Sequence, residues 1–553
     1  MDWGRRNAPA VLLAAALAGS TALLLLFTWE FTFLQDTWEF LMNRRDLSAD
    51  TLLTPHNEHL VAVPVAVEQL LLRLFGMSSA RPEYVILALC LAAAALLLFL
   101  YVRRRLGPWP ALFGAVLLLF LGPAWEVLLW PFELTLAGSV LFGLAMLLLL
   151  DREDARGDVG ACACLCLSIG CSGVGLPFAA AAAVDVVQKR RRLGLGRAYL
   201  VLVPALLFGL WYLGWGSDAE THVSLRNVLA SPRYVFESVA AAAGSLLGLG
   251  TSPFDGSPDP VWGRVILVAL VVAFAYRQIR RPGLPPGFWP VAAAAAANWF
   301  LTAFNQIPGR DPSSSRYQYV GAVFVLLLLA NLLQGVSFGR RALATGAVVT
   351  VAAVAVNVVV LENGRDSLRQ QSVLTQADLA AIEIAKRTVA PEFSLNTEVA
   401  GTTTLIDVQV AKYLPAVEEY GSPAYTPAEL ADAPDYGRRQ ADIVLSQALP
   451  LSTFTRLDAY DPASPGENCV ALPVGDPSSP EELRISAGLT RIELAPGPHA
   501  GFSLRRFATG EYPVITEGAP GGSVTTLRIP RDRAPGYPWY LRVEASQQAR
   551  VCR

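Results

Sequence analysis

Long uninterrupted apolar blocks fill the first two thirds of the chain and restrict its fold more than any other feature. Blocks of about 15–20 residues, the length a helix needs to cross a bilayer, follow one another from Ala10 to about Leu361. Hydrophobic residues make up 53% of the 553 residues and charged residues only 16%, against about 25% charged residues in soluble proteins. The sequence therefore predicts a polytopic α-helical membrane protein and excludes a soluble enzyme and a disordered chain.

Arginine clusters between the apolar blocks indicate how the spans are oriented, because positive residues favour the cytoplasmic side. With the N-terminus in the cytoplasm and 11 spans, every cluster falls inside and the C-terminal part falls outside the cytoplasm. The apolar stretch 233–250 is therefore placed as a lateral or re-entrant helix, since a span there would move two clusters outside. The Ala-, Leu- and Gly-rich composition is typical of a GC-rich bacterial genome, so we expect the bacterial cytoplasmic (inner) membrane. The predicted spans are 10–28, 84–102, 109–128, 132–150, 159–173, 174–188, 198–216, 262–277, 288–304, 317–335 and 342–361.

The composition changes after Glu362, where the chain becomes polar and contains no further apolar block. We predict a membrane domain over 1–361, an extracytoplasmic mixed segment over 362–460 and an extracytoplasmic β-sandwich-like domain over 461–553. Helices are expected at 363–388 and near Tyr436–Leu449, and short alternating runs separated by Gly and Pro indicate strands after Cys469. Cys469 and Cys552 are the only cysteines in this part, and an oxidising compartment favours a disulfide between them.

A carboxylate just beyond the first span is the first candidate for catalysis. Asp36 opens the long loop 29–83, which the topology places on the outer face. A carboxylate at that depth can act as a base, hold a metal or accept a hydrogen from an acceptor. The alternative is an ordinary interfacial acid.

Two of the chain's four histidines lie together in the same loop. Thr54 can cap a helix and Pro55 suits its first position, so we expect an amphipathic surface helix to begin here. Within that helix, His56 and His59 would share one face beside Glu58. Capping needs neither histidine, so a catalytic, substrate-binding or metal role is the competing interpretation. A divalent metal could be held only weakly, because no third ligand is fixed, and no other cofactor is indicated.

Two further outer loops carry polar residues close to the membrane. Trp130 fits an interfacial anchor, but Glu133 starts an apolar span, where an acid is costly and usually faces a cavity. Arg310 and Arg316 lie outside against the orientation bias, and Arg316 precedes Tyr317 at the head of a span. Arginine suits bidentate phosphate recognition, so these residues are candidates to hold a lipid phosphate. The alternative is a pair of interfacial anchors.

Several functions are disfavoured by what the chain contains. The formal net charge of -2 gives no basic field for nucleic acid. No Walker A, GxSxG, HExxH or Rossmann signature occurs in a supporting context. ATP-driven transport by this chain alone is therefore not expected.

The order of these motifs resembles the GT-C superfamily of integral-membrane glycosyltransferases, over about two thirds of the chain. The short motifs that carry the resemblance are Asp36-x-Trp38, His56-Asn57-Glu58-His59, Trp130-x-Phe132 and Ser315-Arg316-Tyr317. The family's second-loop Asp-x-Asp pair is replaced here by single acids, Glu126 and Glu133. The resemblance implies a GT-C-like membrane domain and an inverting transfer of a sugar from a polyprenyl-phosphate donor, at the outer face, to a glycan, lipid or protein acceptor.

The resemblance also implies roles for the candidate residues. Asp36 would deprotonate or orient the acceptor hydroxyl. Arg316, together with Arg310, would bind the leaving phosphate and stabilise its charge. The side chains that would line the site are His56, Glu58, His59, Trp130, Glu133 and Tyr317.

Other classes remain as alternatives to this enzyme. A lipid-linked glycan transporter or flippase would need polar residues through the depth of the bilayer, whereas most of these spans are Ala, Leu and Val. A non-catalytic envelope-assembly protein would keep its function after Asp36→Ala. An O-antigen-type polymerase or ligase would use a diphosphate-linked donor instead.

Overall fold

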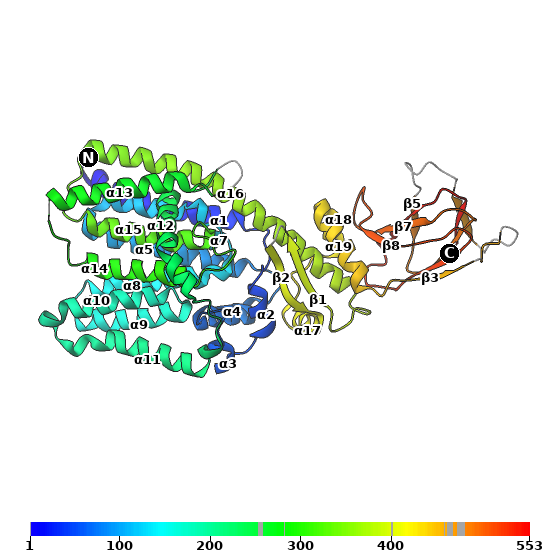
Figure 1. The fold of residues 1–553 in the computed structure, drawn as a ribbon, viewed down its shortest axis with the longest axis horizontal. Helices are drawn as coiled ribbons and strands as arrows, with labels where there is room; N and C mark the ends of the chain where they lie inside the picture. The colour runs from blue at the N-terminus through cyan, green and yellow to red at the C-terminus, as the bar shows by residue number, and fades with distance from the viewer. Residues whose placement is uncertain are drawn as a thin grey trace. The chain divides into compact units, whose positions relative to one another are not determined.

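The computed structural model describes residues 2–252, 258–280, 282–399, 402–457, 459–461, 468–472 and 482–552. The chain, coloured by residue number in Figure 1, forms two compact units. The first, called here the helical unit, comprises Met1–Glu30, Arg44–Leu71 and Arg81–Arg369. The second, called the C-terminal unit, comprises Phe31–Asn43, Leu72–Ala80 and Gln370–Arg553. Each unit is described by itself.

Long apolar helices build the helical unit, as the sequence predicts. Its α-helices are α1 (Asp2–Phe27), α3 (Ala49–Leu53), α4 (Ala62–Phe75), α5 (Arg81–Leu106), α6 (Pro108–Leu119), α7 (Trp125–Leu129), α8 (Leu134–Leu150), α9 (Ala155–Cys171), α10 (Gly175–Leu193), α11 (Tyr199–Gly214), α12 (Leu225–Leu246), α13 (Pro260–Arg280), α14 (Phe288–Phe304), α15 (Ser315–Leu332) and α16 (Arg340–Ile384). Helices α4 and α16 continue into the C-terminal unit. The fold class of a polytopic helical membrane protein is confirmed.

Each of the eleven predicted spans overlaps a helix of the structure, although 109–128 is interrupted at 120–121. Among the described residues, seven helices are long and apolar enough to cross a membrane, and an eighth passes if α6 and η1–α7, bent by 48°, count as one span. Helix α14 is apolar but shorter. The predicted segments 159–173 and 174–188 correspond to α9 and α10, which break at Ser172 as their Gly-rich junction suggests.

Helix α12 covers the stretch that the sequence analysis placed as a lateral helix. Near its start, the Asn227 amide donates to the carbonyls of Phe304 and Gln306, where α14 ends. At its end, the Ser245 hydroxyl donates to Gln318 in the first turn of α15. The end of α14 and the start of α15 are joined by a short loop, so both ends of α12 lie on the same side of the bundle. Figure 1 shows α12 running across the long helices, in agreement with the lateral placement.

Two antiparallel sheets form the strand-rich part of the C-terminal unit. Their strand orders are β5-β10-β7-β8 and β3-β9-β6-β11-β4, and β1 and β2 form a separate hairpin. Burial alternates along the strands, as in β10, where Trp539, Leu541 and Val543 are buried. This is the pattern expected of a sandwich. The strands are β1 (Ser394–Val399), β2 (Thr402–Gln409), β3 (Ser452–Arg456), β4 (Cys469–Leu472), β5 (Glu482–Ile485), β6 (Gly488–Leu494), β7 (Ala500–Arg505), β8 (Val514–Ala519), β9 (Val524–Ile529), β10 (Trp539–Glu544) and β11 (Ala549–Cys552).

Three helices follow the β1–β2 hairpin in the C-terminal unit. They are α17 (Val410–Tyr420), α18 (Pro427–Asp432) and α19 (Asp435–Ala448), the last matching the helix expected near Tyr436–Leu449. The fully buried Asp442 of α19 accepts hydrogen bonds from the backbone N–H groups of Arg506, Phe507 and Ala508. Cys469 and Cys552 form a disulfide that joins β4 to β11.

The division between the units differs from the boundary expected after residue 361. Helix α16 runs without a break from Arg340 to Ile384, and the compact units divide between Arg369 and Gln370. Two segments of the first loop, Phe31–Asn43 with α2 (Thr37–Asn43) and Leu72–Ala80, belong to the C-terminal unit. The loop is therefore shared between the two units.

Candidate substrate pocket

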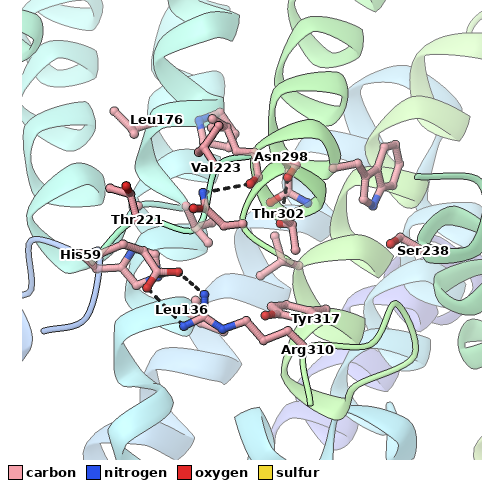
Figure 2. A pocket seen from close by; sticks show the side chains of 18 of the residues that line it. His59, Leu136, Leu176, Thr221, Val223, Ser238, Asn298, Thr302, Arg310 and Tyr317 are labelled. Carbon is pink, nitrogen blue, oxygen red and sulfur yellow. Dashed lines mark hydrogen bonds and ion pairs between the residues drawn. The ribbon is translucent and has the colours of Figure 1, made fainter. Parts of the chain in front are cut away.

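A cavity of about 270 Å³ lies in the helical unit between helix ends and loops. One end is polar and carries Glu58, His59, Arg310 and Tyr317, while the rest is mainly apolar. Figure 2 shows Arg310 and Tyr317 at the polar end, with Asn298 and Thr302 further along one helix. The apolar wall comes from the 56–60 segment and from α8, α10, α11, α14 and α15, and includes Leu60, Leu136, Val174, Leu176, Pro177, Phe208, Leu301 and Val320.

The turn that carries Glu58 and His59 is a tight hairpin, so the predicted start of the surface helix at Pro55 is wrong. His56 and His59 exchange backbone hydrogen bonds of 3.0 Å in both directions, and Asn57 has a φ of 50°. Asparagine tolerates this left-handed conformation better than most residues. Thr54 instead closes α3, donating its hydroxyl to the carbonyl of Asp50. The amphipathic helix α4 begins only at Ala62.

A buried arginine holds this hairpin in place. The Arg44 guanidinium, 3% exposed, donates to the carbonyls of Thr54 and Pro55 at 2.8 and 2.9 Å. These carbonyls directly precede His56, so Arg44 fixes the approach of the chain to the hairpin. Gly173 allows His59 to lie close to the α9–α10 junction, because a Cβ there would come within 2.7 Å of the imidazole Nδ1.

Arg310 reaches the pocket from the loop between α14 and α15. The loop turns at Ile307-Pro308-Gly309-Arg310, where the Arg310 N–H donates to the carbonyl of Ile307 and Gly309 has a φ of 86°. Proline followed by glycine is the sequence that a type II turn requires. The Tyr234 hydroxyl of α12 donates to the Arg310 carbonyl at 2.9 Å. The backbone that presents the guanidinium is therefore held from two sides.

The polar end contains a carboxylate, a guanidinium and an imidazole in contact. Arg310 Nη1 and Nη2 donate to Glu58 Oε1 and Oε2 at 2.5 and 3.2 Å, as the dashed lines in Figure 2 mark. His59 Nε2 lies 3.7 Å from Glu58 Oε1. Two of the guanidinium N–H groups thus go to Glu58, and arginine carries further N–H donors. The Arg310 guanidinium is therefore fixed in position by Glu58 and still has N–H groups that can bind an anion.

The charges at this end follow from burial and from these contacts. Burial alone would raise the pKa of the Glu58 carboxyl, but His59 and the hydrogen-bonded Arg310 outweigh it and hold the pKa below its ordinary value. Burial lowers the pKa of the His59 imidazole; Glu58 opposes this, and Arg310 and His56 add to it. At neutral pH the pocket therefore holds an ionised Glu58–Arg310 pair beside a neutral His59.

Three other predicted residues, one in the hairpin and two in the 130–133 segment, are not among the residues that line the pocket. The His56 and Trp130 rings lie 5.0 and 5.1 Å from the ring of Phe132, centroid to centroid. Glu133, 3% exposed, is at the N-terminal end of α8. A carboxylate there interacts favourably with the helix dipole.

The structure separates Arg316 from its sequence neighbour Tyr317. Tyr317 lines the first pocket, whereas Arg316 lines a second cavity with Glu126. The Arg316 backbone N–H donates to the Glu126 carboxylate at 3.0 Å. Of the two arginines expected at the phosphate, Arg310 is the one in the first pocket.

Asp36 belongs to the C-terminal unit and not to the unit that contains the pocket. It lies in a turn in which Gln35 has a φ of 47°. This turn is tied to α16, because the Gln35 amide donates to Gln371 at 2.7 Å. Trp38, fully buried, packs against Tyr413 with a centroid distance of 6.1 Å. The Trp in the Asp36-x-Trp38 motif is thus a core residue, and the catalytic role of Asp36 stays a prediction.

Several pocket residues were not singled out as site residues from the sequence. Ser238, Thr302 and Thr221 line the cavity, together with Asn298. The Thr302 hydroxyl donates to the Asn298 carbonyl one turn earlier at 2.9 Å. An asparagine and a threonine four residues apart in an otherwise Ala-rich helix were the signal that could have pointed to them.

Metal ligands do not gather at the two histidines. Among the described residues, the one group of three His, Cys, Asp or Glu ligand atoms within reach of one ion is Cys469, Glu493 and Cys552. Its cysteines are joined in the disulfide. His56 and His59 point to different surroundings, His56 to Phe132 and His59 to Glu58.

Comparisons with known proteins add little to this geometry. No protein-family model and no curated protein matches the sequence. Two solved structures of ArnT from Cupriavidus metallidurans are similar, each with 14% sequence identity. The apo structure has a TM-score of 0.47 and the match covers 80% of this chain and 96% of that chain. The structure bound to undecaprenyl phosphate has a TM-score of 0.45, with 74% and 85% covered. Because both TM-scores lie below 0.5, the likeness carries no argument.

Proposed function

We propose that the protein is a GT-C-type glycosyltransferase of the bacterial inner membrane. It moves a sugar from a polyprenyl-phosphate donor to a hydroxyl group of a glycan, lipid or protein acceptor at the extracytoplasmic face. The observation that carries the proposal is the first pocket, which joins an apolar wall to a polar end containing Arg310. A lipid phosphate has the same two parts, a hydrocarbon chain and an anion.

The pocket divides the recognition of this donor between its two ends. The apolar wall, to which Leu176 and Phe208 belong, accommodates the first part of the polyprenyl chain. Arg310 donates to the phosphate oxygens in a charge-assisted, directional contact. Glu58 fixes the plane of the guanidinium before the donor arrives, so little orientation entropy is lost on binding. His59 and Tyr317 add polar contacts beside the phosphate.

The proposed reaction is a displacement at the anomeric carbon. The acceptor oxygen attacks that carbon opposite the phosphate, the bond from carbon to phosphate oxygen breaks, and polyprenyl phosphate leaves with the electron pair. The acceptor proton passes to the carboxylate of Asp36, which we propose as the general base on the basis of the family resemblance. Arg310 stabilises the negative charge that develops on the leaving phosphate.

A transfer assay with three variants tests this function. Purified protein in nanodiscs is given a panel of polyprenyl-phosphate sugars with envelope-glycan acceptors, and released polyprenyl phosphate and product mass are followed. Arg310→Gln and Asp36→Asn are expected to lose turnover. Arg226→Gln is the matched control, because Arg226 is an exposed arginine at the start of α12. If wild-type protein moves labelled lipid across the bilayer without turnover, the transporter alternative replaces the enzyme.

A further inference from the structure

A second cavity of about 410 Å³ lies in the helical unit on the other side of the α14–α15 loop. Its walls come from the η1–α7 segment, the loop and α16, and its character differs from that of the first pocket. Hydroxyl, amide and charged groups dominate its lining, which includes Trp125, Glu126, Asp311, Ser314, Arg316 and Asn363. Among the described residues of this lining, Pro123, Pro258 and Val360 carry the aliphatic side chains, fewer than in the first pocket.

One stretch of loop separates the two cavities. Gly309, Asp311 and Ser313 line the second cavity, whereas Arg310 and Pro312 line the first. The loop turns twice here, at 307–310 and at 311–314, where the Ser314 N–H donates to the Asp311 carbonyl at 3.0 Å, so that neighbouring residues face different cavities. The wall between the cavities is therefore a single chain thick, and ligands in the two cavities would be near neighbours.

The position of this wall is fixed by reciprocal hydrogen bonds. The Glu126 N–H donates to the Ser315 hydroxyl at 3.0 Å, and the Glu126 carboxylate accepts from the Arg316 N–H at 3.0 Å. The Arg316 Nε also lies 3.6 Å from the same carboxylate, and its side chain is 44% exposed. Helix α15 thus starts from an anchored point, with the guanidinium at the cavity.

The lining suits a ligand rich in hydroxyl groups. Carboxylates accept hydrogen bonds, guanidinium N–H groups donate them, and serine and asparagine do both. Trp125 adds an aromatic surface, as sites for uncharged polar ligands commonly do. The formal charges of Glu126, Asp311 and Arg316 sum to −1, and Arg316 is paired with Glu126, so the cavity favours a neutral ligand over an anion.

We infer that the second cavity holds sugar units of an oligosaccharide acceptor that do not themselves react. This inference rests on the proposed function, because it names the class of acceptor. A unit held here, one chain thickness from the first pocket, would leave the terminal unit of the acceptor free to pass over the loop towards the donor. Acceptors of two or more units then bind more tightly than a single sugar.

The test compares acceptors of different length in wild type and in variants whose second cavity is obstructed. Ser314→Phe adds a ring at the cavity wall, and the Ser314 hydroxyl makes no cap hydrogen bond that the change would remove. Ser337→Phe is the matched control, because Ser337 is an exposed serine in the loop after α15. Asp311→Asn is a second variant with almost unchanged volume. The acceptors are the methyl glycoside, disaccharide and trisaccharide of the sugar that supports wild-type turnover, and donor hydrolysis without acceptor is measured in parallel.

We expect the wild-type KM to fall at least tenfold from the glycoside to the trisaccharide. Ser314→Phe should abolish that advantage and Asp311→Asn should reduce it, with donor KM, donor hydrolysis and the glycoside KM unchanged. The inference is overturned if the wild type shows no length dependence, or if both variants keep it. Absence of any turnover by the wild type would instead reject the proposed function. In that case, equilibrium binding of two probes, maltotriose and chitotriose, tests whether the second cavity binds sugar. Ser314→Phe must weaken the binding. Binding that is undetectable in wild type, or unchanged in Ser314→Phe, overturns the inference.

Discussion

Replacing Arg310 by glutamine removes the guanidinium from the polar end of the first pocket while keeping a shorter, uncharged polar side chain. The wild-type guanidinium is held by two hydrogen bonds to Glu58 and is 21% exposed. On the proposed function it also donates to the donor phosphate. Arg310→Gln therefore tests whether this pocket recognises the phosphate.

The size of the effect follows from the kind of contact that is lost. A hydrogen bond to a charged group contributes about 1.5–3 kcal/mol, and a bidentate contact lies towards the upper end. We take about 2–3 kcal/mol, which corresponds to a fall of about 30- to 150-fold in kcat/KM for the donor, since each 1.4 kcal/mol is tenfold. Arg310→Lys keeps the charge but loses the planar guanidinium, so its kcat/KM for the donor should lie between those of Arg310→Gln and wild type.

A double variant distinguishes the loss of phosphate binding from repulsion of the donor by an unpaired Glu58. Arg310→Gln leaves the Glu58 carboxylate, 16% exposed, without its guanidinium, and that negative charge would repel the donor. The variant carrying both Glu58→Gln and Arg310→Gln removes the repulsion. We expect it to stay at least tenfold below wild type. Recovery to within threefold of wild type, or a loss of less than threefold in Arg310→Gln alone, would refute the assignment of Arg310 to the phosphate.

Four further outcomes follow from individual residues. Asp36→Asn should lower turnover by about 10²- to 10⁴-fold, the range for a general base, with the donor KM within twofold of wild type; steady-state kinetics check this. The pKa of Glu58 is below its ordinary value of 4.5, so its pairing stabilises the fold above that pH and is lost as the pH falls through the lowered pKa; melting curves should fall more steeply in wild type than in Glu58→Gln below about pH 4.5. Cys552→Ser should destabilise the C-terminal unit by about 2–4 kcal/mol, and a reductant should have the same effect on wild type but none on the variant, which denaturation with and without reductant shows. Asp442→Ala strands three backbone N–H groups at the end of β7, so denaturation should reveal a loss of about 3 kcal/mol, with a smaller loss in Asp442→Asn.

The helical architecture could be predicted because its signal is local. Each predicted span is a continuous apolar block, and hydrophobic length alone determines that such a block forms a helix in lipid. The lateral placement of α12 followed from charge rather than from length, because a further membrane crossing there would have placed two arginine clusters outside the cytoplasm. The change to a polar composition after Glu362 likewise indicated a separate C-terminal part, although α16 carries its helix past that point to Ile384.

The site was harder to predict, because its contacts join residues far apart in the chain. Glu58 and Arg310 are 252 positions apart, and nothing in either segment specifies the other. The helix expected at Pro55 failed because Asn57 takes a positive φ and closes a hairpin, a choice that tertiary support from Arg44 stabilises. Arg310 and Asp311 line different cavities because the loop turns at 307–310 and again at 311–314, and composition does not reveal which way each side chain then faces.

On the proposed function, the first pocket binds a lipid-linked sugar phosphate for transfer. The most direct measurement is release of polyprenyl phosphate by purified protein in nanodiscs, with and without acceptor glycan, comparing wild type with Arg310→Gln and Arg226→Gln. We expect acceptor-dependent release by wild type and Arg226→Gln, and release at least 30-fold slower by Arg310→Gln. Equal release by all three, or no release with any donor by folded wild-type protein, would contradict it.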